Sequence, residues 1–206
     1  MPLVIHPRIG RSLRRIATLT ALTWLAGAAA AQAACPTPAM SQPFAQFGDT
    51  GSYFTAPGGT FEEAKTSWKL RSRSAIVAEN EPWRVNGPTH TRSLRVTNGS
   101  ATSPVFCVDR TMPTFRMFAR QTVRGAGLIV RLTYKDRYGK KRVHTDEFGI
   151  LADGSMPFWR PTAPMELATA LPIPAGGSLD VQIELETMKG ASSWQVDDVE
   201  IDPYRS

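Results

Sequence analysis

The sequence predicts an all-β protein, a two-sheet antiparallel β-sandwich. Between residues 52 and 206, about ten short segments alternate apolar and polar residues, which is typical of half-buried strands. Turn-forming residues separate these segments roughly every 8–15 residues. No segment keeps the 3.6-residue apolar period of an amphipathic helix. Short strands at this spacing are typical of a β-sandwich.

Residues 1–33 have the pattern of a secretory signal peptide. Four arginines between Arg8 and Arg15 precede the apolar run Ile16 to Ala30, and Ala31-Gln32-Ala33 matches an A-x-A cleavage site. The apolar run is short and rich in alanine for a membrane span. We therefore expect a mature chain that starts at residue 34, has no transmembrane segment, and acts as a secreted, periplasmic or cell-envelope protein.

The charge of the chain is informative only after this segment is set aside. The sequence has 24 basic and 18 acidic residues, a net charge of +6. The expected signal holds four of the basic residues and no acidic one, which leaves 20 against 18. A nearly neutral mature chain gives nucleic-acid binding no electrostatic support, so we expect no nucleic-acid partner.

The expected mature chain contains two cysteines, Cys35 and Cys107. Two cysteines in an exported chain most often form a disulfide; the alternative is one buried and one terminal thiol. Residues 34–51 contain three prolines and predict an extended lead-in. A disulfide would strap this lead-in across a sheet of the β-sandwich domain, residues 52–206.

The strands are expected in the following order. A short strand at 53–55 ends in the turn 57–59, and the segments 60–63 and 68–70 follow. Further strands are predicted at 75–78, 92–96, 105–108, 114–122, 128–134, 141–145 and 179–186. Residues 128–134 and 141–145 form a hairpin, and Trp159, between two prolines, marks an edge or loop. In 114–122, Phe115, Met117 and Ala119 alternate with Arg116, Phe118 and Arg120.

The closing segment, residues 194–204, does not fit a simple strand. Strict alternation would put Trp194 and Val196 on one face with Asp198 and Glu200, and Val199 and Ile201 on the other with Gln195 and Asp197. Neither face would then be apolar through the centre. This conflict indicates a special role for one of the two adjacent aspartates.

Two segments resemble the galactose-binding-like and carbohydrate-binding-module jelly rolls. Gly59-Thr60-Phe61-Glu62 is similar to their opening strand, and residues 194–199 are similar to their closing W-x-[IV]-D-D-V strand. Residues 103–104, 116–120 and 159–161 also follow the pattern, while Gly58 and Ser67 replace the usual Asn and Gly. The resemblance implies jelly-roll topology, and the order of the pieces also resembles that of secreted bacterial proteins.

The resemblance also implies a structural calcium ion where the opening and closing strands meet. By residue-for-residue matching, Glu62 and Asp198 would be side-chain ligands, with backbone carbonyls near Phe61 completing the shell of hard oxygen atoms. The alternative is that Asp197 and Glu200 are solvated and that Asp198 hydrogen-bonds a neighbouring loop.

A saccharide-binding face is the second expected site. Sugar rings stack their C–H patches on aromatic rings, and flanking polar groups bind the hydroxyls. Trp83, Trp159, Tyr138 and Arg160 are the candidate ligand-binding residues. The alternative is that most of these rings pack inside the protein, as we expect for Trp68 and Trp194.

These observations predict an exported, non-catalytic binding module, with carbohydrate as the first ligand class. One alternative is a structural or adhesive cell-envelope protein with a protein partner; another is a polysaccharide-acting enzyme, because a sandwich can host such sites. No nucleophile-elbow motif supports catalysis. Two exposed aromatic rings beside polar groups would favour saccharide binding, a large apolar patch would favour a protein partner, and a cleft with perturbed carboxylates would favour an enzyme.

Overall fold

The computed structural model describes residues 35–36, 38–123, 127–148, 156–188 and 193–203. The expected signal peptide lies outside these residues. All the described elements belong to one structural unit, residues 32–206. Among the described residues, no helix has both the length and the apolar composition that crossing a membrane requires.

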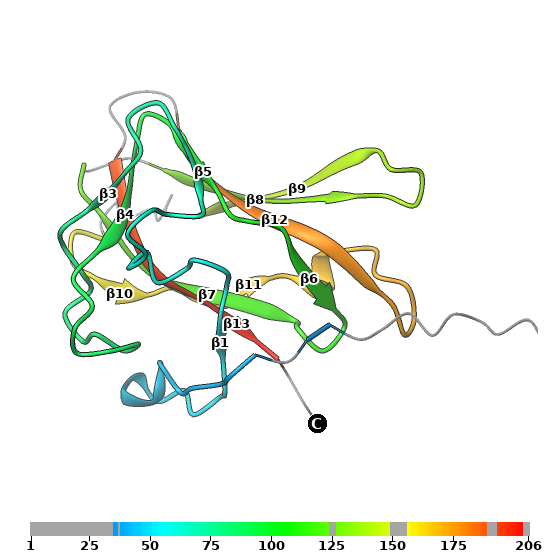
Figure 1. Ribbon diagram of the computed structural model, residues 1–206, viewed down its shortest axis with the longest axis horizontal. Coiled ribbons are helices and arrows are strands. Elements are labelled where there is room, and N and C mark those ends of the chain that lie inside the picture. The colour runs from blue at the N-terminus through cyan, green and yellow to red at the C-terminus, as the bar shows by residue number, and fades with distance from the viewer. Residues whose placement is uncertain (1–34, 37, 124–126, 149–155, 189–192, 204–206) are drawn as a thin grey trace, which may run out of the picture. The chain divides into compact units, whose positions relative to one another are not determined.

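Two antiparallel sheets face each other, which confirms the predicted β-sandwich (Figure 1). The first sheet has the order β10-β7-β13-β4-β3, with β1 paired to β13 and β11 to β7. The second has the order β2-β5-β12-β8-β9, with β6 paired to β12. The elements are η1 (Ala45–Phe47), β1 (Phe54–Thr55), β2 (Lys69–Arg71), β3 (Ala75–Val77), β4 (Ser93–Thr97), β5 (Ser100–Thr102), β6 (Phe106–Asp109), β7 (Thr114–Gln121), β8 (Leu128–Lys135), β9 (Lys141–Phe148), β10 (Arg160–Pro161), β11 (Met165–Glu166), η2 (Ala168–Ala170), β12 (Ser178–Thr187) and β13 (Ser193–Asp202).

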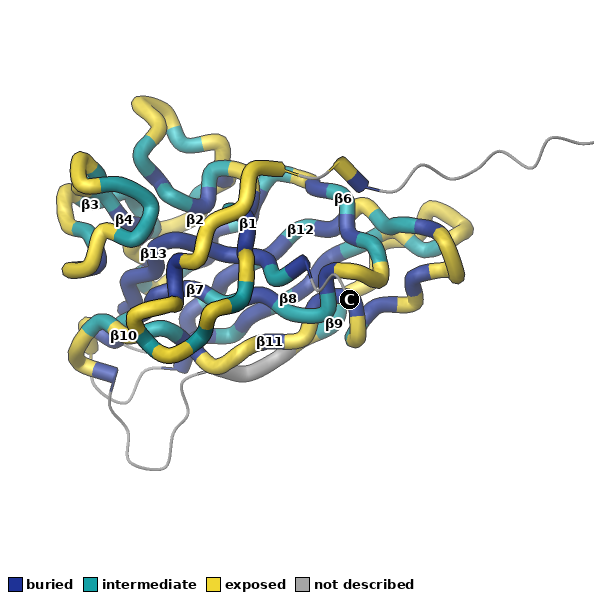
Figure 2. The backbone as a smooth tube through the Cα atoms, turned by 90° about the horizontal axis from the view of Figure 1, so that it is seen from below, coloured by how far each residue is buried: buried dark blue, intermediate teal, exposed yellow. Residues whose placement is uncertain are grey.

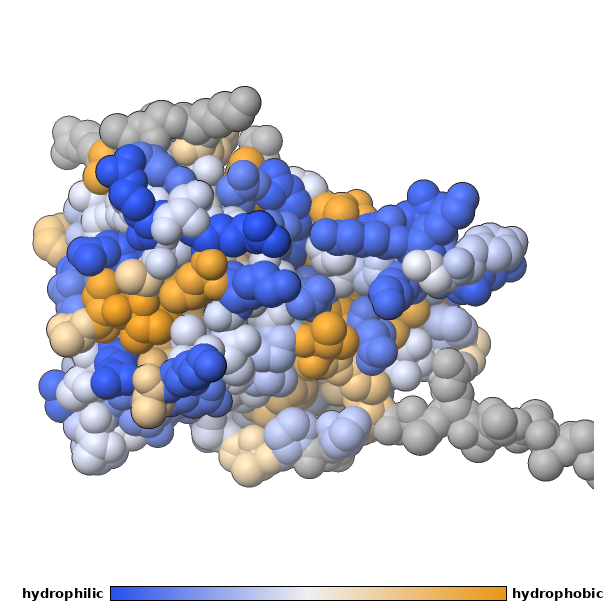
Figure 3. Space-filling model, turned by 45° about the horizontal axis from the view of Figure 1, so that its top comes forward, coloured by the Kyte–Doolittle hydropathy of each residue, from blue (hydrophilic) through white to orange (hydrophobic). Residues whose placement is uncertain are grey.

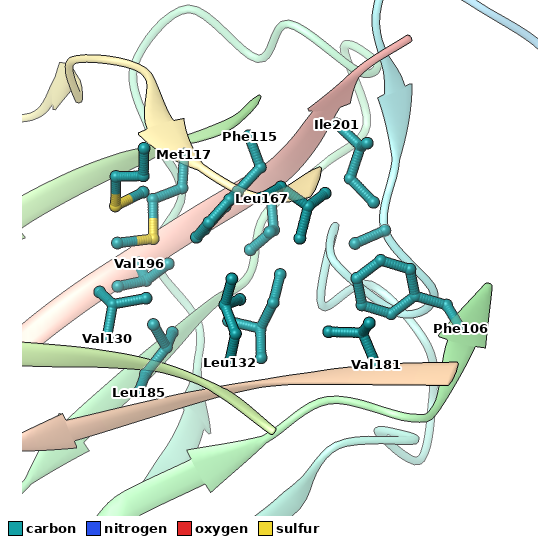
Figure 4. Close-up of a cluster of buried hydrophobic side chains, with 14 of the residues drawn as sticks. Phe106, Phe115, Met117, Val130, Leu132, Leu167, Val181, Leu185, Val196 and Ile201 are labelled. Carbon is teal, nitrogen blue, oxygen red and sulfur yellow. The ribbon is translucent and has the colours of Figure 1, made fainter. Parts of the chain in front are cut away.

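The inward faces of the two sheets form the main hydrophobic core. Met117 and Val196 of the first sheet lie across from Val130 and Leu185 of the second (Figure 4). All four side chains are buried, as apolar residues that alternate along strands must be when two sheets pack. Trp68 and Trp194 also lie in this core, as expected.

Strand β7 confirms the predicted alternation and has a covered outer face. Its residues Phe115, Met117 and Ala119 point into the main core. On the outer side, the fully buried ring of Phe118 stacks on Phe44 at a centroid distance of 5.3 Å. The lead-in therefore covers part of the outside of the first sheet. Its Phe44 forms a second apolar cluster there with Tyr53 and Phe118.

The disulfide Cys35–Cys107 is present, with Cα atoms 5.5 Å apart, and it fixes the start of the lead-in to β6. The lead-in differs from the extended segment that the sequence predicts. It contains a short 3-10 turn, Ala45–Phe47, next to Phe44. Burial of Phe44 against β7 outweighs the preference of this proline-rich stretch for an extended backbone.

Strand β13 corrects the predicted assignment of its faces. A register shift between Asp197 and Glu200 marks a β-bulge, and Asp198 has a φ of +45°. A bulge inserts an extra residue and so reverses the alternation beyond it. Val199 and Ile201 consequently point into the main core, as Trp194 and Val196 do before the bulge, and Asp198 and Glu200 turn outward.

The bulge is held by the turn that follows β1. Ala56 N donates to Val199 O at 2.8 Å, and Val199 N donates to Gly59 O at 3.1 Å. A Cβ atom on Gly59 would lie 2.9 Å from Ala56 O and 3.0 Å from Val199 O. Glycine is thus required here for close backbone approach, which explains the glycine of the opening motif.

Several short strands were not expected from the sequence. They include β5, which pairs with β2 and β12, and the short edge strands β10 and β11, which pair with β7. Pairing with a long neighbouring strand defines these segments, and two or three residues are too few to show alternation. Trp159 directly precedes β10, in agreement with its predicted edge or loop position.

Candidate functional site

Four carboxylates are buried on the outer side of the first sheet. Glu81 comes from the loop of residues 78–92, which joins β3 to β4, and Asp197, Asp198 and Glu200 come from β13; none has exposed surface. Figure 2 looks onto this sheet from outside and shows β13 as buried chain. The alternative in which Asp197 and Glu200 are solvated is therefore wrong, because the covering segments exclude water from them.

Two of these carboxylates organise the 78–92 loop. Glu81 accepts hydrogen bonds from the backbone N–H groups of Trp83 (2.5 Å) and Val85 (2.7 Å). Asp197 accepts from Glu81 N at 3.2 Å and from Asp198 N at 3.0 Å. These bonds satisfy backbone donors that would otherwise be buried without partners, and they fix the position of Trp83.

The other two carboxylates share one partner. Asn86 Nδ2 donates to Asp198 Oδ1 at 2.9 Å and to Glu200 Oε1 at 2.6 Å, and Thr55 Oγ1 donates to Glu200 Oε1 at 3.0 Å. The second oxygen of each carboxylate, Asp198 Oδ2 and Glu200 Oε2, is buried and has no hydrogen-bond partner. An unpaired buried carboxylate oxygen is costly, and a bound proton or cation would lower that cost.

The electrostatics of the cluster lead to the same inference. Burial raises the pKa of Asp197, and the charge of Asp198 raises it further. Burial also raises the pKa of Asp198, with added repulsion from Glu200, Glu81 and Glu62. The pKa values of Glu81 and Glu200 are raised by burial as well. Burial thus disfavours the charged form of each group, and a nearby cation would offset that cost.

The carboxylates of this cluster meet some of the requirements for binding a hard cation such as calcium. Calcium accepts carboxylate, amide and carbonyl oxygens, and the unpaired oxygens of Asp198 and Glu200 are suitable donors. Within the described ranges, no group of three or more His, Cys, Asp and Glu side chains could hold a metal ion. Glu62 lies close enough to raise the pKa of Asp198, but its Oε1 accepts from the N–H groups of Thr91 and Arg92. Its role as a ligand stays a prediction.

A catalytic use of these carboxylates would need access to a substrate. Asp197 and Asp198 have raised pKa values because they are buried, and neither has exposed surface. They lie beneath the 78–92 loop. A cleft with perturbed carboxylates would favour an enzyme, and these two residues do not form one.

An aromatic surface lies beside this cluster, on the outer side of β7. It consists of Phe47, Trp83 and Trp159, which surround Phe118. The Trp83 ring is 4.8 Å from that of Phe47 and 5.5 Å from that of Phe118. Trp159 packs against the cluster that contains Phe118. Trp83 is 37% exposed, so part of its ring faces solvent.

A polar network borders the aromatic surface. Arg120 donates from Nε to Gln195 Oε1 at 2.6 Å and forms an ion pair with Glu79. Gln195 Nε2 donates to Glu79 Oε2 at 3.0 Å. The guanidinium of Arg120 also lies over the ring of Trp159, 5.2 Å from its centroid. The surface thus combines exposed ring area with the charged groups of Glu79 and Arg120, which can bind hydroxyls.

The structure brings together some of the predicted ligand-binding residues and separates others. Trp83 and Trp159 share the aromatic surface, and Arg160 is exposed in β10 directly after Trp159. Tyr138, 70% exposed, lies in the turn between β8 and β9 of the second sheet. It does not belong to the aromatic surface.

The sequence does not indicate a role for Glu81 or Glu79, and it suggests Asn86 as a polar group beside the saccharide-binding rings, whereas its amide binds Asp198 and Glu200. All three residues lie in the 78–92 loop, where no periodic pattern indicates which side chains face the sheet. The N-E-P turn at residues 80–82 was visible, but a turn motif does not show that its glutamate becomes buried.

No family model matches this chain, and no curated protein matches it. Similar solved structures are carbohydrate-binding modules. The xylan-binding CBM22-1 domain of Xyn10C from Paenibacillus barcinonensis has 11% identity and a TM-score of 0.47, covering 76% of this chain and 97% of that domain. The CBM22-1–GH10 modules of Clostridium thermocellum Xyn10B have 13% identity and a TM-score of 0.46, covering 73% and 28%. A family 30 carbohydrate-binding module has 10% identity and a TM-score of 0.44, covering 66% and 78%. At these identities the likeness concerns the fold alone.

Proposed function

We propose that this chain is an exported, non-catalytic carbohydrate-binding module whose saccharide-binding site is the aromatic surface. One observation carries the proposal: Trp83 and Trp159, 76 residues apart in the sequence, pack on the same aromatic cluster beside a polar network. The sequence predicts both as candidate ligand-binding residues. Their meeting on one surface is what a saccharide platform needs.

The chemistry of the surface suits a neutral saccharide. The exposed part of Trp83 offers an apolar face for the C–H patch of a pyranose ring. Glu79 offers acceptors for hydroxyls and Arg120 offers donors. Gln195 is buried, and its amide holds these two side chains in place. Because Glu79 and Arg120 form an ion pair, the surface gains little net charge from them.

The surface is held in place before a ligand arrives. Trp83 is anchored by Glu81, and Glu81 is anchored by Asp197. Phe118 is fully buried beneath the ring of Trp83. A ring that is already ordered loses little conformational entropy on binding, so weak stacking contacts suffice for measurable affinity.

We also propose that a structural calcium ion stabilises this arrangement from below. Asp198 and Glu200 would hold it, with Glu62 as the further ligand expected from the sequence. The ion would compensate for the negative charge of these two buried carboxylates, which bind Asn86 of the 78–92 loop. The support is the pair of unpaired buried oxygens on Asp198 and Glu200.

Affinity electrophoresis against soluble neutral polysaccharides tests the proposal: xylan, β-glucan, glucomannan and galactan, each with the purified mature chain. We expect at least one to retard the wild type, and Trp83→Ala to abolish the retardation while Tyr138→Ala preserves it. Tyr138 is a matched control, an exposed aromatic on the other sheet. No retardation by any of the four, or equal retardation of Trp83→Ala, would contradict the proposed site.

A further inference from the structure

The turn between β8 and β9 is strongly positive. Residues 135–142 read Lys-Asp-Arg-Tyr-Gly-Lys-Lys-Arg, five basic side chains and one acidic. Residues 34–206 as a whole hold 20 basic and 18 acidic residues. The net positive charge of this turn is therefore larger than that of the whole expected mature chain. Figure 1 shows the hairpin extending at the right of the sandwich, and Figure 3 shows hydrophilic side chains along it.

The single acidic side chain of this turn, Asp136, accepts hydrogen bonds from other residues of the turn. Asp136 Oδ1 accepts from the N–H groups of Tyr138 and Lys140, both at 2.9 Å, and Oδ2 accepts from Arg142 Nε at 2.9 Å. Asp136 therefore shapes the turn and orients Arg142. In the described part of the chain, neither Lys135 nor Arg137 forms an ion pair with a carboxylate. Their positive charges remain available to an anionic ligand.

These cations line a hollow. A space of about 530 Å³ lies between the hairpin and the segment before β12, with Tyr134, Lys135, Arg137 and Tyr138 on the hairpin side and Pro172 and Pro174 opposite. This volume is within the range of small-ligand sites, roughly 300–1,000 Å³.

The walls combine two kinds of chemistry. Arg137 lies over the ring of Tyr138, 4.7 Å from its centroid, and its Nη2 is 2.5 Å from the Tyr138 hydroxyl. This contact holds a planar guanidinium beside an exposed ring. Arginine suits carboxylates because its parallel N–H groups match their two oxygens. Tyrosine rings and proline rings present apolar faces to a sugar ring.

We propose that this hollow is a second binding site, specific for an acidic saccharide whose uronate carboxylates meet Lys135 and Arg137. A hollow with apolar tyrosine and proline walls favours a saccharide over a membrane, which would contact a protruding tip. It likewise favours a saccharide over nucleic acid, which needs a longer basic track. The site lies on the second sheet and is independent of the aromatic surface proposed for neutral saccharides.

Isothermal titration calorimetry with tetragalacturonic acid, and with its fully methyl-esterified form, tests this proposal. We expect the wild type to bind the acid and to bind the ester at least tenfold more weakly, since esterification removes the charged hydrogen bonds. Lys135→Ala/Arg137→Ala should weaken acid binding at least tenfold. Lys69→Ala/Arg71→Ala removes the same charges from β2, at the opposite edge of the second sheet, and should change binding less than twofold.

Other outcomes would overturn the proposal. They are equal affinity for acid and ester, no effect of the hairpin double variant, or no binding of the acid at millimolar concentration. Binding of phosphatidylglycerol vesicles or duplex DNA through the hairpin, without binding of the acid, would identify a general polyanion surface instead. Trp83→Ala separates the two sites: it should leave acid binding intact, and loss of acid binding there would move the ligand to the aromatic surface.

Discussion

The guanidinium of Arg120 lies 5.2 Å from the centre of the Trp159 ring while its Nε donates to Gln195 Oε1 at 2.6 Å. One side chain thus joins the aromatic surface to its polar border. The strand pairing explains the geometry, because Arg120 of β7 stands opposite Gln195 of β13, and Trp159 directly precedes β10 on the other side of β7. The two parts of the proposed site are therefore positioned by the same residue.

Replacing Arg120 should weaken binding of a neutral saccharide. Arg120→Lys keeps the charge but loses the planar fork that reaches Gln195 and covers Trp159. We expect affinity to fall about tenfold, the loss of one well-placed hydrogen bond to a charged group. Titration calorimetry measures the change, with Arg116→Lys as the control. Arg116 has the same strand and face but pairs with Asp49 and lies over Phe44. Equal losses in both variants would indicate a general effect on β7.

Calcium should stabilise the fold through Asp198 and Glu200. If the ion binds the folded state alone with micromolar affinity, millimolar calcium adds about 4 kcal/mol, or roughly 10 °C in melting temperature. A thermal melt with calcium, and then with excess chelator, measures the shift. We expect Asp198→Asn and Glu200→Gln each to abolish it, and Glu62→Gln to reduce it. Asp180→Asn, an exposed acid on β12, is the control. A calcium response that survives Asp198→Asn would place the ion elsewhere.

Without calcium, the protein should lose stability as pH rises. Burial raises the pKa values of Asp197 and Asp198 above their ordinary 3.8. The folded state then holds protons that the unfolded chain releases, so the free energy of unfolding falls from about pH 4 towards neutral pH. Each such proton contributes a slope of up to about 1.4 kcal/mol per pH unit. Urea unfolding in chelator between pH 5 and pH 8 measures it.

Asp198→Asn provides the matching variant for the pH experiment. An amide keeps the shape of the carboxylate, accepts the hydrogen bond from Asn86, and has no charge to bury. We expect the variant to be more stable than the wild type near pH 8 in chelator, with a shallower pH slope. A wild-type stability that rises between pH 5 and pH 8 would show that the buried carboxylates are compensated in another way.

The disulfide should hold the lead-in on the first sheet. In the chain-entropy model, closing a loop of 72 residues stabilises a fold by roughly 4 kcal/mol. Cys35→Ser/Cys107→Ser should lose stability on that scale. Because the lead-in supplies Phe44 and Phe47 to the outer side of β7, the variant should also bind a neutral saccharide more weakly. Urea unfolding and calorimetry measure the two effects. Unchanged saccharide affinity would show that the lead-in is anchored by Phe44 alone.

Alternation predicted the fold where strands are long and each face has one environment. In β7, the core residues Phe115, Met117 and Ala119 can be identified from the sequence because no bulge interrupts the alternation of side chains in this strand. The cysteine pairing was also predictable, because only one pair can form. Short strands such as β5 exist through pairing with β12, and no local pattern encodes that partner.

The site was harder to predict for a physical reason. In β13, a single inserted residue reverses the faces, so strict alternation places Val199 on the wrong side and Glu200 on the face of Trp194 and Val196. The sequence shows the conflict created by two adjacent aspartates, but not its solution. Residue type alone indicates Trp83 and Trp159 as candidates for saccharide binding. Their position on one surface depends on Phe118, and the lead-in buries Phe118 on the outer face of the sheet.

The most direct test of the proposed function uses the four tryptophans of residues 34–206 as internal probes. Their indole N–H signals can be followed by two-dimensional ¹⁵N–¹H NMR during titration with a neutral oligosaccharide of the retarding polysaccharide. Trp68 donates from Nε1 to Pro57 O at 3.1 Å in the core, and Trp194 has no exposed surface. We predict that the Trp83 and Trp159 signals shift on binding while those of Trp68 and Trp194 stay in place. Shifts confined to the two core indoles, or binding that moves none of the four, would contradict the aromatic surface as the saccharide site.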